Sequence, residues 1–400
     1  MTTAIFITKF VPMDVGNGGH HRSYQILHDL ELAVGRDNVK VISFERWLKK
    51  HPPPPQNLNV WAYIGREMKR RVAYYRENPA RVLANTIYTP KEFSIPEFMA
   101  YYQQVIENIP KPAVCIAQHT GFSELIYLNS QYDIPTISCI DNLEAFDRGN
   151  LENRYPQSIL SRRHMLARVI DFANEFQVLA QCIERLFISK VEAGLIGGLG
   201  LSAQHYPYIP VGLIRRRLEY VRRNRTKARI QPGLFLLVGS CEHCTTKESF
   251  LWFLQKARTN GLPNGVRVIV AGSQTDRLLP RGVEVPGLEL KGWLQQRQLD
   301  QLMISTQAVL LPQLVGFGAL TRFSELSCAG IPCIVLRHPT HAVDLPPGFE
   351  VVTDEWASWY YAMERLMRSD QRINSGYSTW ENNQPRTLRT VVEKLIRNIT

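Results

Sequence analysis

The sequence predicts an α/β protein made of two similar halves, each an open parallel sheet covered by helices. Both halves open in the same way: residues 4–11 and 233–239 are short apolar runs that lead into a glycine loop and then into a stretch with helical spacing. Apolar runs of strand length alternate with helical stretches through the rest of each half, an order typical of parallel sheets. The 400 residues, 44% of them hydrophobic, are enough to build two cores.

The first half is predicted to span residues 1–210. Its opening strand precedes a glycine-rich turn and a helix whose apolar side chains recur at helical spacing. Ser189 opens a later helix, and Glu192 is the partner expected of it in a capping box. Further strands are expected at residues 39–44, 113–118, 136–140 and 177–188, and helices at 20–34 and 158–176, with 45–108 largely helical.

The second half is predicted to span residues 233–375. The arginine-rich segment that precedes it, residues 211–232, is polar and poor in turn residues, so we expect a linker or an exposed helix. Strands are expected at residues 233–239, 266–271, 288–292 and 350–352, and two further strands are expected to end at residues 311 and 335. Helices are expected at residues 355–367 and 386–399.

A candidate ligand site lies in the second half, where a buried strand leads through a glycine loop into a helix. Gly316 and Gly318 let the backbone approach a ligand closely, and Thr321 is the expected cap of the helix. The free N–H groups of such a helix end, with the charge of Arg322, form a site for phosphate. Glu325, one turn further, is a carboxylate suited to accept the two hydroxyl protons of a ribose. Donors for a diphosphate beside an acceptor for a diol predict a nucleotide-sugar site.

Strand–glycine–helix units are common in α/β proteins, and many of them bind nothing, so the local pattern alone leaves both interpretations open. The segment nevertheless resembles the donor-site signature of retaining GT-B glycosyltransferases of the "glycosyl transferases group 1" type. Many members carry a second Glu ahead of the glycines, where this chain has Val315 in a loop two residues longer. Backbone N–H groups of Phe317, Ala319 and Leu320 are then expected to hold the sugar. The matching residues are Gly316, Gly318, Thr321, Arg322, Glu325, Gly330 and Pro332.

The resemblance implies the GT-B fold, in which two Rossmann-like domains face each other across a cleft. It covers nearly the whole chain except residues 45–110. Residues 376–400 are expected to form a C-terminal helix that crosses back to the first domain. The other donor-site residues that the resemblance implies in the second half are Gly239, Ser240, Lys247 as a contact of the diphosphate, Gly272, Trp293 and Leu294.

In the first half, Gly18 and Gly19 resemble the acceptor-side glycine turn of the family, which lies across from the donor diphosphate. Arg22 is the basic residue expected in that turn. His20 and His21 are also candidate ligands in this turn. We favour surface positions at the start of the helix as the simpler account of both. The resemblance therefore implies that the two glycine loops face each other.

His119 follows the strand at residues 113–118, and strand C-termini are where parallel sheets hold ligands. It matches a family histidine that contacts the donor sugar and its diphosphate near the reaction centre. Asn142 and Glu144 belong to the turn that relatives write as His-Asn-x-Glu, and they are expected on the acceptor side. Asp141 replaces the histidine of that turn.

The activity that the resemblance implies is transfer of a sugar from a UDP-sugar, with UDP-glucose expected, to a glycan or lipid-linked acceptor in polysaccharide assembly. His119, Arg322 and Lys247 are the expected catalytic groups. Retention is thought to proceed by same-face attack, in which the leaving phosphate takes the acceptor's proton. No metal and no cofactor are expected, since Arg322, Lys247 and the helix dipole neutralise the leaving group and no Asp-x-Asp occurs in a suitable loop.

Two other interpretations remain open. A GT-B-shaped protein that binds nucleotide or glycan without catalysis would explain the missing first Glu and the missing arginine of the 239–247 loop. A sugar-nucleotide epimerase or a phosphorylase would need paired carboxylates and histidines, or a pyridoxal-phosphate lysine, and the sequence gives no sign of either set.

The net charge is +11, with basic clusters at residues 69–71 and 162–163 and from 215 to 229. No nucleic-acid-binding motif accompanies the charge, so anionic phospholipid head groups at a membrane surface fit better, with solvated helix faces as the alternative. No run of about eighteen apolar residues occurs, and residues 1–13 resemble a strand more than a signal peptide. Seven scattered cysteines suit a reducing compartment. The expected location is cytoplasmic, peripheral at the inner face of the membrane.

Overall fold

The structure, a computed structural model, describes residues 2–51, 95–146, 162–227, 230–280, 282–314, 318–369 and 376–399. Several features of the sequence lie outside these ranges: the basic cluster at residues 69–71, most of the span 45–108, and Val315, Gly316 and Phe317 of the second glycine loop.

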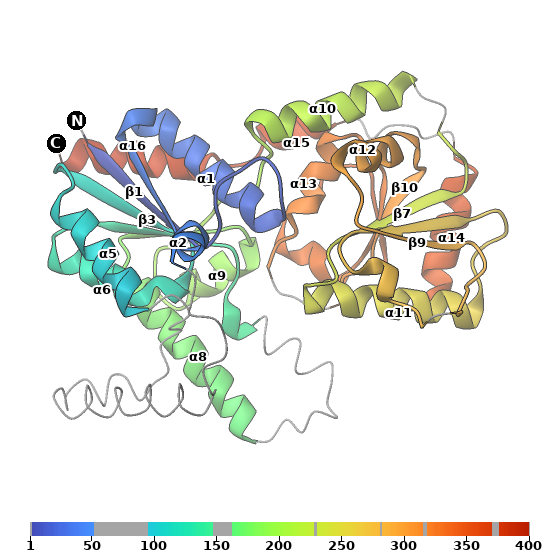
Figure 1. Cartoon of the computed structure of the whole chain (residues 1–400), viewed down its shortest axis with the longest axis horizontal. Coiled ribbons are helices and arrows are strands. Elements are labelled where there is room, and N and C mark those ends of the chain that lie inside the picture. The colour runs from blue at the N-terminus through green and yellow to red at the C-terminus, as the bar shows by residue number, and fades with distance from the viewer. Residues whose placement is uncertain are drawn as a thin grey trace.

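The N-terminal half is built on a six-stranded parallel sheet with the order β2-β1-β3-β4-β5-β6. The order places the ends of β1, β3 and β4 side by side at one edge of the sheet (Figure 1). The strands are β1 Thr3–Thr8, β2 Val39–Ser43, β3 Ala113–Ala117, β4 Thr136–Ile140, β5 Glu184–Phe187 and β6 Gln204–His205. The helices are α1 Gly18–Val34, α2 Phe44–Lys50, α5 Pro96–Glu107, α6 Ser123–Gln131, α8 Arg162–Ala180 and α9 Lys190–Gly198.

The C-terminal half repeats the plan with a second six-stranded parallel sheet, in the order β12-β11-β10-β7-β8-β9. Its strands are β7 Leu234–Val238, β8 Arg267–Ala271, β9 Leu288–Gly292, β10 Ala308–Leu311, β11 Cys333–Leu336 and β12 Phe349–Val352. Its helices are α10 Gly212–Lys227, α11 Cys244–Asn260, α12 Gln296–Ser305, α13 Thr321–Cys328, α14 Trp356–Met367 and α15 Tyr377–Asn382. The predicted pair of α/β halves is confirmed.

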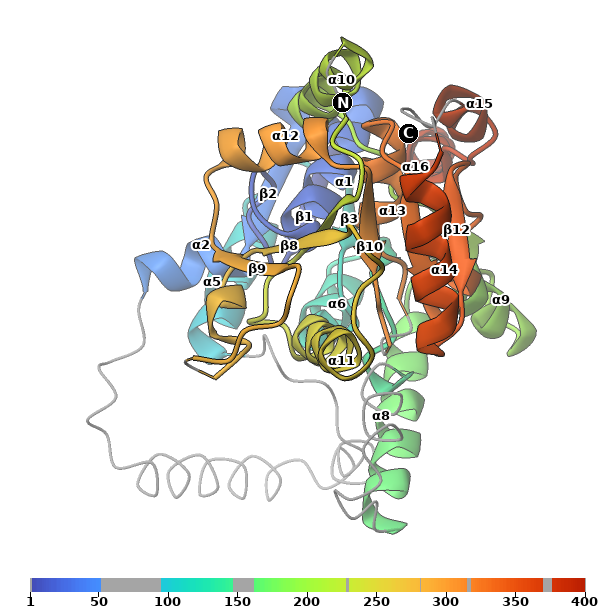
Figure 2. The ribbon, with the colours of Figure 1, turned by 90° about the vertical axis from the view of Figure 1, so that its right-hand side faces the viewer.

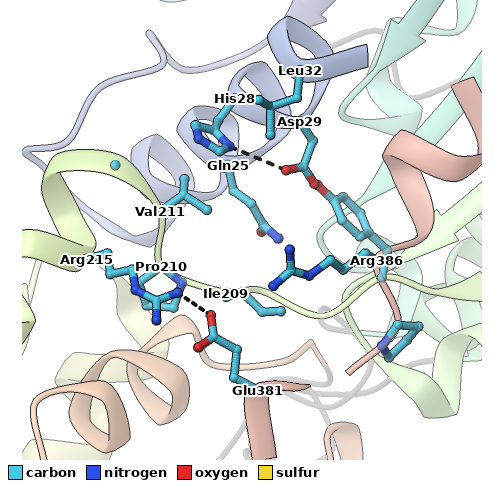
Figure 3. A pocket seen from close by; sticks show the side chains of 13 residues that line it. Gln25, His28, Asp29, Leu32, Ile209, Pro210, Val211, Arg215, Glu381 and Arg386 are labelled. Carbon is cyan, nitrogen blue, oxygen red and sulfur yellow. Dashed lines mark hydrogen bonds and ion pairs between the residues drawn. The ribbon is translucent and has the colours of Figure 1, made fainter. Parts of the chain in front are cut away.

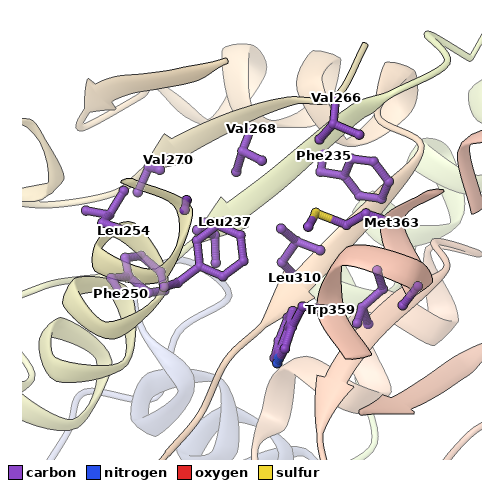
Figure 4. Packing of buried hydrophobic residues seen from close by; sticks show 14 of the residues in the cluster. Phe235, Leu237, Phe250, Leu254, Val266, Val268, Val270, Leu310, Trp359 and Met363 are labelled. Atoms are coloured by element: carbon purple, nitrogen blue, oxygen red, sulfur yellow. The ribbon is translucent and has the colours of Figure 1, made fainter. Parts of the chain in front are cut away.

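Alternation along the buried strands divides the C-terminal core between the two faces of its sheet, because successive side chains of a strand point to opposite faces. Phe235 and Leu237 of β7 pack against α11 and α14, in a cluster that includes Trp359 (Figure 4). Leu234 and Leu236 pack on the other face, against α10, α12 and α13. Figure 2, which looks onto this half, shows α11 and α14 on one side of the sheet and α10 and α12 on the other.

The C-terminal helix α16, Thr387–Ile399, crosses back to the N-terminal half, so both ends of the chain lie together there (Figure 1). Leu388, Val391 and Val392 join a cluster formed by α1 and the first strands. The expected return of residues 376–400 is therefore seen for α16, whereas α15 packs in the C-terminal core through Tyr377 and Trp380.

The arginine-rich segment forms the helix α10, which packs on α12 and α13 through Ile214, Leu218 and Val221. Arg225 is buried on the same side and donates hydrogen bonds to four main-chain carbonyls around the C-terminal end of α12, those of Met303, Ile304, Thr306 and Gln307. A guanidinium suits this position because a helix C-terminus presents unsatisfied carbonyls and a negative dipole end.

Three helix starts differ from or refine the expectations. Asn17 caps α1 by accepting from the backbone N–H groups of Gly19 and His20, so this helix begins at Gly18. Ser189 caps α9 as expected, but the Glu192 carboxylate accepts from the backbone of Leu143 and completes no capping box. The prediction that Thr321 caps α13 is wrong, since Leu320 occupies the cap position without a side-chain bond.

Within the described ranges, every helix is too short or too polar to span a bilayer.

Candidate functional site

One contact between the two halves joins the first turn of α1 to the first turn of α13. The contact is close: a Cβ atom on Gly18 would lie 2.6 Å from Thr321 Oγ1. One turn further on both helices, His21 Nδ1 lies 2.6 Å from Glu325 Oε1, and the Tyr208 hydroxyl donates to the same oxygen at 3.0 Å. The predicted meeting of the two glycine loops is therefore present, at least for Gly18 and the helix that follows the second loop.

Glu325 is held as a carboxylate by its surroundings. Burial alone raises the pKa of Glu325, but the hydrogen bond from His21 and the nearby charges of His21 and Arg217 bring it below its usual value. An ionised carboxylate only accepts, so His21 donates through Nδ1. The other ring nitrogen of His21, Nε2, is buried and has no hydrogen-bond partner among the described residues. Only Oε1 of Glu325 is used in these bonds.

The C-terminal half presents bare backbone at the sheet edge that faces this contact. Gly272, with φ +135°, follows β8, and a Cβ there would overlap the carbonyl oxygen of Gly239 after β7. Only glycine fits, because the conformation is strained for other residues and the space is filled by main chain. Gly318 lies against the other half, with a Cβ position 3.0 Å from the carbonyl oxygen of Asp141. The predicted loop glycines therefore bring main-chain groups together.

Arg322 lies over this bare backbone in the first turn of α13. A Cβ on Gly239 would be 2.8 Å from a guanidinium nitrogen of Arg322. Burial lowers the pKa of Arg322, against the opposing influence of Glu325 and Cys241. Arg322 forms no ion pair with any residue in the described ranges. A half-buried cation that forms no ion pair among the described residues, at the start of a helix, is an arrangement suited to an anion.

Lys247 lies on the first turn of α11, close enough to Cys241 for both Lys247 and Arg322 to act on the thiol. Its side chain is exposed, unlike that of Arg322. Burial raises the pKa of Cys241 to about 11 in spite of the two cations, so the thiol stays protonated. The two predicted diphosphate contacts therefore both lie near Cys241 of the 239–243 loop.

The N-terminal sheet edge carries a hydrogen-bonded side-chain network. Gln118, directly after β3, accepts from Thr8 and Ser23 at 2.6 Å each and donates to Asp141 Oδ2 at 2.9 Å. His119 Nε2 lies 3.8 Å from the same Asp141 oxygen. Burial, with the charge of Lys9, lowers the pKa of His119 to about 3, so the imidazole is neutral at physiological pH. Burial raises the pKa of Asp141 to about 6 against the charge of Arg22.

Two buried glutamates, which the sequence did not single out for this role, hold the turn that contains Asn142 and Glu144. Glu175 of α8 accepts from the backbone N–H groups of Glu144 and Ala145, at 3.0 Å each. Glu192 accepts from Leu143 N at 2.7 Å. Burial raises the pKa of Glu175 to about 7 despite these bonds. The only signal in the sequence was that each carboxylate lies on a side of its helix whose other residues face the core. Such a position predicts a buried hydrogen-bond acceptor but does not identify the donor.

Asn142 itself faces the second glycine loop, since a Cβ on Gly318 would lie 3.0 Å from the Asn142 Cβ. Glu144 is half-buried beside it. In the C-terminal half, Trp293 follows β9 with 76% of its surface exposed, and Leu294 after it is half-buried. Ser240 lies in the half-buried loop after β7. The predicted site residues that the structure describes thus come from both sheet edges.

Arg22 lies elsewhere than expected. Its side chain is 1% exposed and donates to the carbonyls of Tyr206 and Pro207, while its guanidinium stacks on the Tyr206 ring at 4.0 Å. Its charge is therefore shared between Asp141, 3.7 Å from Nε, and the carbonyls of the segment that leaves the N-terminal half, and the side chain itself is buried. The sequence could not reveal this, because the carbonyls lie more than 180 residues away along the chain.

A cavity of about 230 Å³ opens beside the two chain segments that connect the halves (Figure 3). Arg386 points into it, and Arg215 pairs with Glu381 at 2.5 Å on its wall. None of the predicted donor-site residues lines this cavity. Its place at the connections separates it from the contact of α1 with α13.

No group of three or more His, Cys, Asp or Glu side chains with metal-holding geometry occurs among the residues that the structure describes.

The sequence matches no protein-family model. No curated protein is similar to it in sequence either. Solved structures do share its architecture. HepE (Alr3699) of Anabaena, crystallised with UDP and glucose, aligns with a TM-score of 0.56 at 11% identity over 99% of this chain and 98% of that one. TarM aligns with a TM-score of 0.51 at 10% identity over 75% of this chain and 58% of its own. The apo structure of OtsA aligns with a TM-score of 0.50 at 10% identity over 98% and 96%.

These similarities establish the fold. The chain has the GT-B fold, with two Rossmann-like domains that face each other, as the sequence predicted.

Proposed function

We propose that the chain is a retaining glycosyltransferase that transfers a sugar, expected to be glucose, from a UDP-sugar to a glycan or lipid-linked saccharide during polysaccharide assembly. The observation that carries the proposal is Arg322: a half-buried guanidinium, without an ion pair to any described residue, over the main chain of Gly239 at the start of α13. That arrangement suits the diphosphate of a nucleotide sugar, whose charge the cation and the helix end would share.

The donor would lie along the C-terminal sheet edge. Lys247, in the first turn of α11, is expected to approach the diphosphate together with Arg322, beside the main chains of Gly239 and Gly272, which pack against each other. Oε2 of Glu325 is the group for the ribose, one turn along α13 from Thr321. The base is expected at Trp293 and Leu294, after β9.

The sugar would face the N-terminal sheet edge, where His119 lies beside Asp141. A neutral imidazole can donate one hydrogen bond and accept another, so His119 can hold sugar hydroxyls without adding a charge. Asn142 and Glu144, in the turn held by Glu175, are expected to meet the acceptor.

The chemistry follows from the charge that develops on the leaving UDP. The acceptor oxygen bonds to the anomeric carbon as the bond from that carbon to the phosphate oxygen breaks, and the phosphate oxygen takes the acceptor's proton. Arg322 and Lys247 stabilise the developing charge by pre-placed electrostatics, so neither a metal nor a cofactor is proposed. The bound UDP and glucose in HepE, which shares the fold, support the choice of donor class.

Calorimetric titration of the full chain with UDP, GDP and ADP and their glucose conjugates, with and without magnesium, tests the proposal. We expect magnesium-independent binding of UDP and UDP-glucose. Arg322→Met should weaken UDP binding about 10- to 100-fold, the loss of a charge-assisted hydrogen bond, whereas Arg297→Met, at an exposed site on α12, should not. Anomeric analysis of the product by NMR then checks retention, and an inverted product would contradict it.

A non-catalytic nucleotide- or glycan-binding protein is the second candidate. The bond of Glu325 Oε1 to both His21 and Tyr208 favours it, because the carboxylate already serves the contact between the halves. UDP binding with no release of UDP from UDP-glucose in the presence of a pool of glycan acceptors would make this candidate the better one.

A further inference from the structure

The outer face of α10 carries an unusual combination of exposed side chains. Leu213 and Tyr220 are 51% and 46% exposed, and Arg216, Arg223 and Lys227 are exposed as well. Their spacing of three, seven, ten and fourteen residues from Leu213 puts all five on one side of the helix. We call these five residues the α10 stripe. Figures 1 and 2 both show α10 along the upper edge of the molecule.

The charge of the α10 stripe is not neutralised by any of the residues that the structure describes. Arg216, Arg223 and Lys227 form no ion pair with any residue in the described part of the chain. The one acidic residue of the helix, Glu219, is engaged by Arg215 at 2.8 Å. An unpaired cationic stripe therefore faces outward.

The opposite side of α10 fixes the helix to the fold. Ile214, Leu218 and Val221 are buried against α12 and α13, and the bonds of Arg225 to the end of α12 hold the C-terminal part of the helix. The α10 stripe therefore does not need to fold on binding, and no ordering entropy opposes its use as a docking surface.

We propose that the α10 stripe docks the protein on the surface of an anionic lipid bilayer. Cations attract the lipid phosphates, and long arginine and lysine stems can lie along the boundary while their charged ends stay in water. Leu213 and Tyr220 would enter the boundary between head groups and acyl chains, where a tyrosine ring keeps its hydroxyl wet. The complementarity of charge, with apolar side chains set between the cations, argues for a membrane more than for a nucleic acid, since leucine neither pairs with phosphate nor stacks on a base as an aromatic ring does.

Flotation of the full chain with vesicles tests the proposal. Vesicles of phosphatidylcholine with about one third phosphatidylglycerol should bind the protein at low salt, and pure phosphatidylcholine vesicles should not, because the cations need an anionic surface. Each cation near such a surface contributes about fivefold in partitioning, which is about 1 kcal/mol converted at 1.4 kcal/mol per tenfold. The triple variant R216A/R223A/K227A should therefore bind about 100-fold more weakly.

A control with the same loss of charge separates position from net charge. Arg258, Arg277 and Arg337 are exposed on other elements of the same half, so R258A/R277A/R337A should bind vesicles within a few-fold of the parent chain. L213A/Y220A should weaken binding to anionic vesicles while keeping its salt dependence. Equal losses in the two triple variants, or no loss in either, would overturn the proposal, as would no vesicle binding by the parent chain. Thermal unfolding of each variant checks that it is folded.

Insertion can be seen directly with a label. Six cysteines are buried, and labelling of the seventh is corrected for with the parent chain, so a polarity-sensitive fluorophore on Y220C would report on the α10 stripe. Its emission should shift to the blue with anionic vesicles, while the same label on R277C should not respond. Labelled Cys244 background is measured on the parent chain and subtracted. A single-stranded oligonucleotide that displaces the vesicles and binds more tightly than they do would assign the stripe to nucleic acid and refute the membrane proposal.

Discussion

The two sheet edges that face each other in this protein are built by different means. At the N-terminal edge, polar side chains bond to one another: Gln118 joins Thr8, Ser23 and Asp141. At the C-terminal edge, Gly239 and Gly272 have no side chains, and their main chains touch. One edge therefore offers shaped side-chain chemistry, and the other offers backbone. The difference teaches that a duplicated architecture need not duplicate its chemistry.

The largest expected effect comes from adding one atom to the bare edge. Gly272→Ala should lower the free energy of unfolding by about 2–5 kcal/mol, because the methyl group overlaps the Gly239 carbonyl in a strained backbone conformation. Denaturant unfolding measures it. Gly197→Ala in α9 is the matched control: no atom lies within 4 Å of its Cβ position, so the change should be neutral or stabilise by up to about 1 kcal/mol. A tolerated alanine at 272 would mean that the edge is not closed by backbone.

The second effect separates the two uses of Glu325. Glu325→Gln should lower the free energy of unfolding by about 1–3 kcal/mol, through weaker bonds from His21 and Tyr208, and should lower UDP affinity by a similar free energy. Tyr208→Phe, its control, removes a bond between the halves but leaves the carboxylate, so it should reduce stability alone. Unchanged UDP binding in Glu325→Gln would assign this residue to the interface only.

A third test concerns the side-chain edge and uses pH. The folded pKa of His119, about 3, is below its unfolded value of 6.5, so the unfolded chain binds the extra proton between these values. Stability from this group is complete above pH 6.5 and is lost as the pH falls toward 3, with a slope approaching about 1.4 kcal/mol per pH unit. His119→Gln cannot titrate, and its acid unfolding profile should be flatter by that amount. Parallel profiles for both proteins would show that His119 is accessible to protons.

The smallest effect is expected at the surface between the halves. Lys190 pairs with Asp344 across them, but both side chains are substantially exposed. Lys190→Ala should change the free energy of unfolding by less than about 0.5 kcal/mol, a difference that added salt should remove. A loss of more than about 1 kcal/mol would mean that exposed pairs, and not the buried Glu325 contacts, hold the halves together.

Sequence reasoning located the elements well where the signal is local. Apolar strands and the glycines after them can be predicted from the sequence, because burial and turn geometry depend on neighbouring residues. It failed where a side chain finds its partner far along the chain. Arg22 was expected on the acceptor side and Arg225 in a linker or exposed helix, yet both are buried on distant carbonyls. Nothing in the pattern around an arginine tells whether water or a carbonyl will meet it. The roles of the predicted site residues in binding and catalysis stay predictions.

The hydrogen bonds of Arg22 to the segment that connects the halves limit where the backbone of that segment can turn. Arg22 and Gln25 tie the carbonyls of Tyr206 and Pro207 to the N-terminal half, whereas Ser324 of the C-terminal half donates to the carbonyl of the next residue, Tyr208, at 2.7 Å. Two adjacent residues are thus anchored to different bodies. A change in the angle between the halves that kept these bonds would therefore have to be taken up, along this connection, by the backbone torsion angles between Pro207 and Tyr208.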